Sequence, residues 1–186
     1  LRFTRTLTGA GHILGVALHA GTARAWLGHD VARLTDSAVP LRTKVVCDAR
    51  AGERSILRER SEVGAVRAAE AFLRPLLPAL DDEARLAASL VERITADREL
   101  TRVEHLVQLT GRSERALQRL FQRHVGLSPK AVLRRFRLAE AAETLATHPA
   151  QRLTDLAHAL GYFDQAHFCR DFRAVLGRSV SEYRSD

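Results

Sequence analysis

In the C-terminal half of the chain, apolar residues recur every three or four positions in short blocks that end at glycine. This pattern predicts short amphipathic helices joined by tight turns. The pattern starts at Val103 and starts again at Leu153, about 50 residues later. Glycine, arginine, phenylalanine and serine follow in the same order both times, and one extra residue between Gly161 and Phe168 is the only slip. A repeat of this length indicates a duplicated structural unit.

Each copy has the pattern of a helix-turn-helix, with an apolar helix, a glycine turn and a second helix. The first unit covers about 101–124 and the second about 153–176, and a longer helix over about 129–147 joins them. Pro129 suits the first turn of that helix. Predicted N-caps are Thr101, Ser113 and Asp164. The expected buried residues are Val103, Leu106, Val107, Leu117, Leu120, Phe121 with His124 or Val125, Leu133, Phe136, Leu138, Ala142, Leu145, Phe168 and Phe172.

The pattern before these units is less regular. Residues 1–20 alternate loosely and are rich in Thr, Val, Ile and Leu, which predicts two strands, around 1–8 and 12–19. A short helix at 22–28 should end at glycine, and longer helices are expected over about 42–60 and 62–77. An aspartate at 81–82 then starts a helix with the buried stripe Leu86, Leu90, Val91 and Ile94. We place a domain boundary near 79, between 1–78 and 79–186.

Composition narrows the class of protein. The chain has 186 residues and is 46% hydrophobic, so it can bury a sizeable core and is not of a disordered type. No apolar run approaches the roughly 18 residues that span a bilayer, which predicts no membrane partner. No signal-peptide pattern is present, which favours the cytoplasm. Methionine is absent even from the first position, so we expect the chain to be the tail of a longer protein.

The net charge of +7 is concentrated in one stretch. Residues 112–137 contain eight Lys or Arg and a single acid, Glu114, so their balance equals that of the whole chain. A charge run is most often a solvated helix surface. This run coincides with the second helix of the first unit, which favours contacts with phosphates.

Long polar side chains occupy the outer face of that second helix. They are Arg115, Gln118, Arg119 and Gln122. Arginine can bond guanine, and glutamine adenine, through paired hydrogen bonds to the base edge. An ordinary amphipathic surface helix is the alternative for this helix alone. In the second unit the corresponding outer face is Gln165, Ala166, His167 and Arg170, and Asp164 is interpreted as a cap rather than a base reader.

Several segments carry more than a general helical pattern: 111–121 (GRSERALQRLF), 126–129 (GLSP), 161–168 (GYFDQAHF), and Leu138, Gly177 and Tyr183. Together they resemble the AraC/XylS family of bacterial transcription regulators over about 98–184. The resemblance implies a mainly α fold with a seven-helix domain, in which a linker helix joins two helix-turn-helix units. Val107 and Val132 depart from the pattern, since the family usually has alanine and an aromatic residue there.

The resemblance also implies roles for individual residues. Those expected to face the bases are Arg115, Gln118, Arg119, Gln165, His167 and Arg170. Phosphate contacts are expected from Arg112, Ser113, Gln122, Lys130 and Arg134. Double-stranded DNA is therefore the expected partner, and RNA polymerase is a further candidate.

A fainter resemblance covers about 9–40, which is similar to the end of a β-rich sensor domain in one branch of the family. Residues 1–78 are accordingly interpreted as the remnant of a sensor or dimerisation domain, partly β, followed by connector helices. This adds a small-molecule effector and a second copy of the chain as candidate partners. No ligand residue is carried over.

Three other classes of protein are alternatives to a DNA-binding regulator. An enzyme or metal protein needs convergent groups, whereas His12, His19, His29 and His148 lack ligand spacing, and Asp155 with His158 is typical of a surface pair. We therefore expect no catalytic residue, metal or cofactor. A redox sensor would use Cys169, since Cys47 and Cys169 form no framework. A protein adaptor or RNA binder is the third, although the major groove of A-form RNA is too narrow for these helices.

Overall fold

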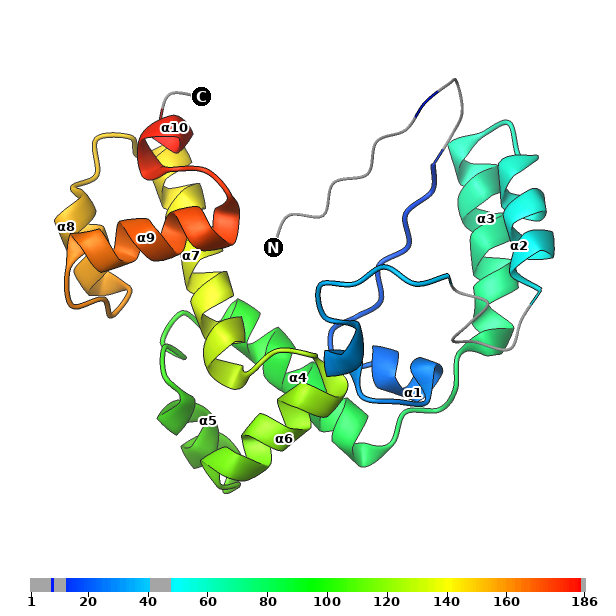
Figure 1. Cartoon of the computed structure of the whole chain (residues 1–186), viewed down its shortest axis with the longest axis horizontal. Coiled ribbons are helices and arrows are strands. Elements are labelled where there is room, and N and C mark those ends of the chain that lie inside the picture. Colours follow the sequence, from blue (N-terminus) through cyan, green and yellow to red (C-terminus); the bar gives the residue numbers. More distant parts are fainter. Residues whose placement is uncertain (1–7, 9–12, 41–47, 185–186) are drawn as a thin grey trace. The chain divides into compact units, whose positions relative to one another are not determined.

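The computed structural model describes residues 8, 13–40 and 48–184 (Figure 1). Within these ranges the chain forms ten α-helices and two short 3-10 helices, and no strand. The predicted mainly α class is therefore correct, but the predicted β content is not found. Residues 13–19 have no regular structure, because a strand needs a neighbouring strand to pair its backbone groups and the described chain offers them none. The other predicted strand, 1–8, lies outside the described residues except for Thr8.

The described residues group into two compact units. The first comprises 90–118 and 127–184, and the second comprises 8, 13–40, 48–89 and 119–126. Two helices, α4 (Asp82–Ala96) and α6 (Glu114–His124), contribute residues to both units. The domain boundary that we place near 79 stays a prediction.

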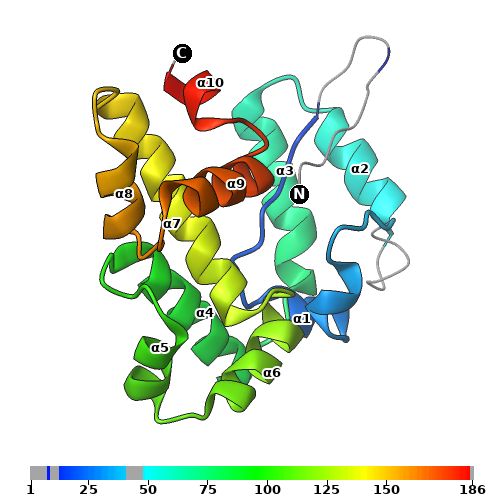
Figure 2. The ribbon, with the colours of Figure 1, turned by 60° about the vertical axis from the view of Figure 1, so that its left-hand side comes forward.

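The second unit begins with short elements. They are α1 (Ala23–Leu27), η1 (Val31–Leu34), α2 (Ala49–Leu57), α3 (Glu62–Leu73) and η3 (Arg74–Leu76). Gly28 ends α1 with a positive φ of 71°, as predicted. Helix α2 contacts α3 along its side (Figures 1 and 2). It is shorter than the predicted helix over 42–60, because Asp48 caps it and accepts a hydrogen bond from the Ala51 N–H at 2.9 Å. Residues 41–47 lie outside the described chain.

Helix α4 begins after Asp81, which caps it by accepting from the Ala84 N–H at 2.7 Å. Segments far apart in sequence also meet in this unit. Gly21 lies so close to α4 that a Cβ there would be 2.5 Å from the backbone nitrogen of Ala88. The Thr35 hydroxyl donates to the Gly126 carbonyl at 2.8 Å. The short N-terminal elements therefore pack on the start of α4 and the end of α6.

The remaining helices are α5 (Val103–Thr110), α7 (Pro129–Thr147), α8 (Leu153–Ala159), α9 (Gln165–Leu176) and α10 (Val180–Arg184). Counted from α4, the described chain therefore has seven helices over 82–184, the number that the resemblance implies. Ser128 caps α7 and Pro129 occupies its first turn. The predicted cap at Thr101 is wrong: α5 starts one residue later than expected, so its N-cap is Arg102, whose side chain makes no capping hydrogen bond.

The first unit encloses an apolar core between α7 and the last three helices. Its buried residues are Leu138, Ala141, Ala142, Leu145, Leu156, Ala157, Phe168, Phe172 and Val180. Four aromatic rings form a chain of edge contacts, with centroids 5.5 Å apart for Tyr162 and Phe168, 5.6 Å for Phe168 and Phe172, and 5.5 Å for Phe172 and Tyr183. Aromatic pairs prefer this geometry. The core fixes the inner face of α9 and so determines which residues α9 presents outward.

Candidate nucleic-acid interface

Both glycine turns have the backbone conformation that a helix-turn-helix joint needs. Gly111 has φ of 66° and Gly161 has φ of 80°, in the left-handed region that side chains disfavour. The helix before each turn is anchored by buried residues, Leu106 in α5 and Leu156 with Ala157 in α8. In each unit, therefore, the glycine gives the turn its backbone conformation, and the buried residues of the preceding helix hold that helix in the core.

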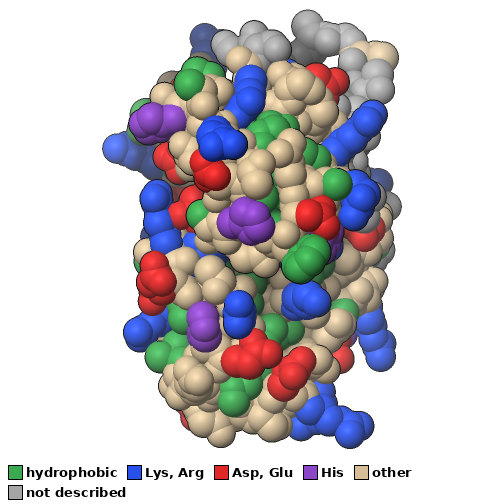
Figure 3. Space-filling view, turned by 90° about the vertical axis from the view of Figure 1, so that its left-hand side faces the viewer, with side chains coloured by type: hydrophobic (Ala, Val, Ile, Leu, Met, Phe, Trp, Pro, Cys, Tyr) green, Lys and Arg blue, Asp and Glu red, His purple; other side chains and the backbone are tan. Residues whose placement is uncertain are grey.

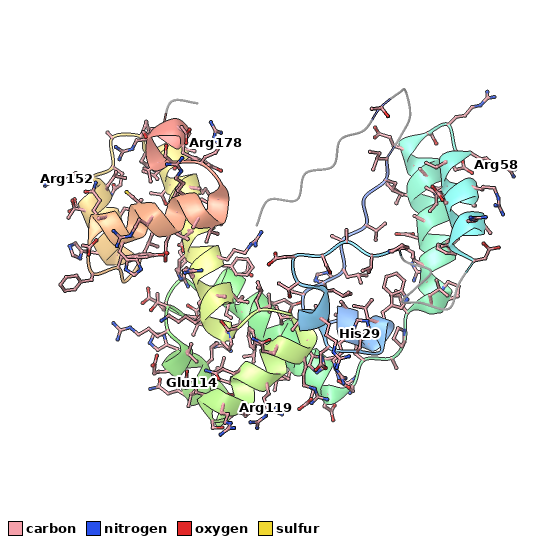
Figure 4. All side chains as sticks on the ribbon, viewed as in Figure 1. His29, Arg58, Glu114, Arg119, Arg152 and Arg178 are labelled. Carbon is pink, nitrogen blue, oxygen red and sulfur yellow. The ribbon has the colours of Figure 1, made fainter. Side chains whose placement is uncertain are left out.

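Helix α6 has a sharply divided surface. Leu117, Leu120, Phe121 and His124 are buried, whereas all four predicted outer residues are exposed: Arg115, Gln118, Arg119 and Gln122. Figure 4 labels Arg119 and Glu114 on this helix. The Gln118 amide donates to the Glu114 carboxylate at 3.1 Å. The Gln118 amide is therefore paired within the helix, one turn from its own position.

Helix α9 presents the second set. Gln165, His167 and Arg170 are exposed. The Asp164 carboxylate accepts from the His167 N–H at 2.6 Å, so Asp164 is a cap, as predicted. The Thr154 hydroxyl donates to the side-chain oxygen of Gln165 at 3.1 Å. The Gln165 amide nitrogen therefore points away from that bond and can donate elsewhere.

A carboxylate that sequence reasoning missed lies behind this face. Asp171 is only 17% exposed and receives a hydrogen bond from the Tyr162 hydroxyl at 3.2 Å. Its oxygens also lie 3.5 Å from a guanidinium nitrogen of Arg134 and 3.8 Å from Nε2 of His167. Burial and the Asp171 carboxylate raise the pKa of Tyr162 well above its usual value. The hydroxyl therefore stays a donor, and the four side chains tie α7 to α9. Spacing i, i+4 from His167 was the available signal for Asp171.

The predicted phosphate set occupies varied environments. Gln122 and Lys130 are exposed and Arg112 is half-buried. Ser113 caps α6, its hydroxyl accepting from the Ala116 N–H at 3.3 Å. Arg134 is exposed but paired with Asp171. These phosphate assignments stay predictions.

Two members of the basic run at 112–137, Arg137 and Arg123, make structural contacts within the fold. Arg137 is 5% exposed and donates to the carbonyls of Asp97 at 2.8 Å and Leu100 at 3.0 Å. It also bonds Glu140 at 2.6 Å. Arg123 is half-buried and pairs with Glu83 at 3.0 Å. Spacing i, i+3 to Glu140 was a signal for the first; nothing local identified the second, because Glu83 lies 40 residues away.

The charged surface is mixed rather than uniformly basic. Figure 3 shows Lys and Arg side chains separated by acidic and histidine side chains on the face that it presents. The repeat adds one exposed arginine that sequence reasoning missed: Arg173 occupies the position in α9 that Gln122 occupies in α6. It lines a hollow together with Arg170, Cys169 and Ser179.

The alternative sites gain no support from the geometry. In the ranges that the structure describes, no three His, Cys, Asp or Glu side chains gather as metal ligands would. Cys169 is half-buried, and burial raises the pKa of its thiol. Cys47 lies outside the described residues. None of the described helices is long and apolar enough to cross a membrane.

Comparison with known proteins agrees with this geometry. A family model described as a helix-turn-helix domain matches residues 106–186. An uncharacterised HTH-type transcriptional regulator of Haemophilus influenzae is 34% identical over 109 residues, which are 59% of this chain and 36% of the relative. The HTH-type transcriptional activator RhaS of an Enterobacter species is 38% identical over 72 residues, or 39% of this chain and 26% of RhaS. The HTH-type transcriptional activator AarP of Providencia stuartii is 35% identical over 82 residues, which are 44% of this chain and 60% of AarP.

The chain spans about a third of the length of the Haemophilus relative and about a quarter of RhaS. No solved structure gives a significant match. Fold and matches together define the class of this protein, which is a helix-turn-helix protein related to transcription regulators. Residues 106–186 are, more narrowly, a helix-turn-helix domain of the AraC/XylS type, which confirms the resemblance found in the sequence.

Proposed function

We propose that this chain is a sequence-specific DNA-binding transcription regulator that reads two successive major-groove segments with α6 and α9. The supporting observation is the repeated outer face: Arg119 and Arg170 occupy equivalent repeat positions, and both are exposed on helices whose opposite sides are buried. Its relatives are named as transcription regulators or activators, a class distinct from enzymes. An AraC/XylS-type domain together with these faces favours duplex DNA over an adaptor role.

The length of α7 suits a linker between two reading heads. Its 19 residues correspond to about 28 Å at a rise of ~1.5 Å per residue. Successive major-groove segments on one side of a duplex are ~34 Å apart. Arg115, Gln118, Arg119, Gln165, His167 and Arg170 would read bases. Arg112, Ser113, Gln122, Lys130 and Arg134 would fix the register through phosphates, with Arg134 exchanging Asp171 for a phosphate.

Control by an effector belongs to the same proposal. A hollow of about 640 Å³ lies among residues 14–19, Trp26 and α3, lined mainly by apolar side chains. Its volume falls in the range of small-molecule sites. Trp26 is the single tryptophan of the chain, so a ligand entering the hollow should shift its fluorescence. The proposal has three further parts. The protein acts in the cytoplasm, it pairs with a second copy of itself, and it contacts RNA polymerase.

Binding should be tested on duplexes that the chain itself selects from a random pool. Fluorescence anisotropy would compare the selected duplex with a scrambled one between about 50 and about 200 mM salt. A specific regulator should prefer the selected duplex by about a thousandfold or more and lose affinity steeply with salt. Equal binding to both duplexes would leave a basic surface without sequence recognition and contradict the proposal.

Arg119→Ala tests base reading directly. We expect it to cost about 1–3 kcal/mol on the selected duplex and to relax the preference at one base pair. Arg58→Ala is the matched control, because Arg58 is also an exposed arginine but follows the last residue of α2 and belongs to neither α6 nor α9 (Figure 4). An equal loss on every duplex would instead make Arg119 a phosphate contact.

A further inference from the structure

A large aromatic side chain is presented to solvent directly before α9. Phe163 is 89% exposed, whereas Phe168 and Phe172 of the same unit are fully buried. Single exposed apolar residues are common on proteins and need no function by themselves. The backbone around Phe163 distinguishes this one.

The turn that carries Phe163 is fixed on both sides. Before it, the N–H groups of Gly161 and Tyr162 each donate at 2.9 Å to carbonyls of α8. The Tyr162 ring packs edge-on against Phe168, and its hydroxyl is bonded to Asp171. After it, Asp164 caps α9 through the N–H of His167. Phe163 therefore projects from a held backbone and cannot fold inward without breaking these contacts.

The second turn is one residue longer than the first. In the first unit a single residue, Arg112, separates Gly111 from the cap residue Ser113. In the second, Tyr162 and Phe163 separate Gly161 from the cap Asp164. The extra residue is the one slip in the repeat. It allows one aromatic ring to anchor the turn while the next is directed outward.

We propose that Phe163 packs against the 5-methyl group of a thymine in the groove segment that α9 reads; this rests on the proposed function. The residues at the start of a recognition helix lie nearest the base edges, and Phe163 directly precedes the cap of α9, next to the exposed Gln165 and His167. A phenyl ring neither donates nor accepts ordinary hydrogen bonds. The thymine methyl is the apolar group that the major groove displays. Phe163 is thus a specificity-determining residue of the second unit.

The test uses the whole chain and the duplex that it selects. Each thymine is replaced in turn by deoxyuridine, which removes only the 5-methyl group. One replacement should lower wild-type affinity about fourfold, the effect of burying one methyl-sized apolar group. Phe163→Ala should bind the unmodified duplex at least that much more weakly and be indifferent to the same replacement. Val63→Ala, which also truncates an exposed apolar side chain, lies on α3 and is the control. It should bind as wild type does.

The result separates this inference from the proposed function. If the wild type selects a duplex but Phe163→Ala binds it unchanged, or binds every duplex more weakly by one factor, thymine recognition by Phe163 is wrong. A uniform loss would point to the sugar-phosphate backbone. If the wild type selects no sequence, the proposed function fails with it. The unfolding midpoint of Phe163→Ala should equal that of wild type, since the side chain is exposed, so weaker binding cannot be attributed to misfolding.

Discussion

Arginine residues in the basic run have opposite environments although their sequence context looks alike. Arg119 projects from α6 and is exposed, while Arg137 is enclosed by α7 and the loop before α5. A guanidinium has five N–H donors, so it can join several carbonyls and a carboxylate at once. In Arg137 that capacity fastens the loop at Asp97–Leu100 to α7 instead of binding a phosphate.

Arg137→Ala should therefore act on stability. Removing the side chain takes the guanidinium donor from the carbonyls of Asp97 and Leu100 and leaves Glu140 paired with Arg98 alone. We expect a loss of about 2–4 kcal/mol in the free energy of unfolding. Urea unfolding followed by circular dichroism measures it. Arg135→Ala, an exposed arginine on the same helix, should change stability by less than about 0.5 kcal/mol. Similar losses for the two variants would contradict the structural role of Arg137.

The thiol of Cys169 decides the redox alternative. Burial raises its pKa, so at a given pH less of it is thiolate than in the unfolded chain. In a Cys47→Ser variant, we expect the Cys169 thiol of the folded chain to be alkylated more slowly than the thiol of the chain unfolded in urea. The ordinary pKa of a cysteine thiol is 9.0, and the rate in the folded chain should still rise with pH above that value. Because the folded pKa is the higher one, ionisation favours the unfolded chain on the alkaline side only. Rapid labelling of the native thiol at neutral pH would revive the sensor hypothesis.

At the scale of elements, local chemistry placed most helices correctly. These predictions rest on short-range features that depend on neighbouring residues only. They are the caps at Ser113, Asp164 and Asp81, the proline at the start of α7 and the glycine turns. The predicted cap at Thr101 fails for a different reason. A residue near a helix start caps only if the helix begins directly after it, and α5 begins at Val103, two residues after Thr101.

Gly161→Ala tests the second turn. No atom lies within 4 Å of the position that a Cβ would take, but φ is +80°, so the cost is backbone strain alone. We expect about 1–2 kcal/mol lost on unfolding. Gly161→Asn should cost less, since asparagine tolerates this region better. Equal costs for alanine and asparagine would show that something other than φ limits the position.

At the scale of the whole molecule, the N-terminal segment belongs to the same compact unit as the end of α6. Thr35 reaches the Gly126 carbonyl, 91 residues away, and Asp30 lies 3.8 Å from Arg123. Helix periodicity carries no information about such pairings, because they join elements of separate patterns. Local alternation predicts a strand at 12–19 but says nothing of a partner strand.

Gly21→Ala measures how strongly this segment packs on α4. A Cβ at Gly21 would meet the backbone of Ala87 and Ala88 at 2.5–2.9 Å, with φ of +91°. We expect more than about 2 kcal/mol of destabilisation. Gly15→Ala is the control, since nothing lies within 4 Å of its Cβ position. If both variants unfold at the same urea concentration, the segment does not pack on α4 in solution.

Periodicity in the sequence was enough to predict the helical class, the duplicated units, their glycine turns, the caps at Ser113 and Asp164, and which residues of α6 and α9 face outward. These follow from periodicity and from steric rules that act within a few residues. Contacts in the folded chain, in contrast, show that Arg137 and Arg123 serve the fold, that Asp171 joins Tyr162, His167 and Arg134, and that Phe163 is held outward. Each of these contacts depends on residues of another element in the folded chain. A periodic pattern describes a single element, so it carries no information about distances between elements.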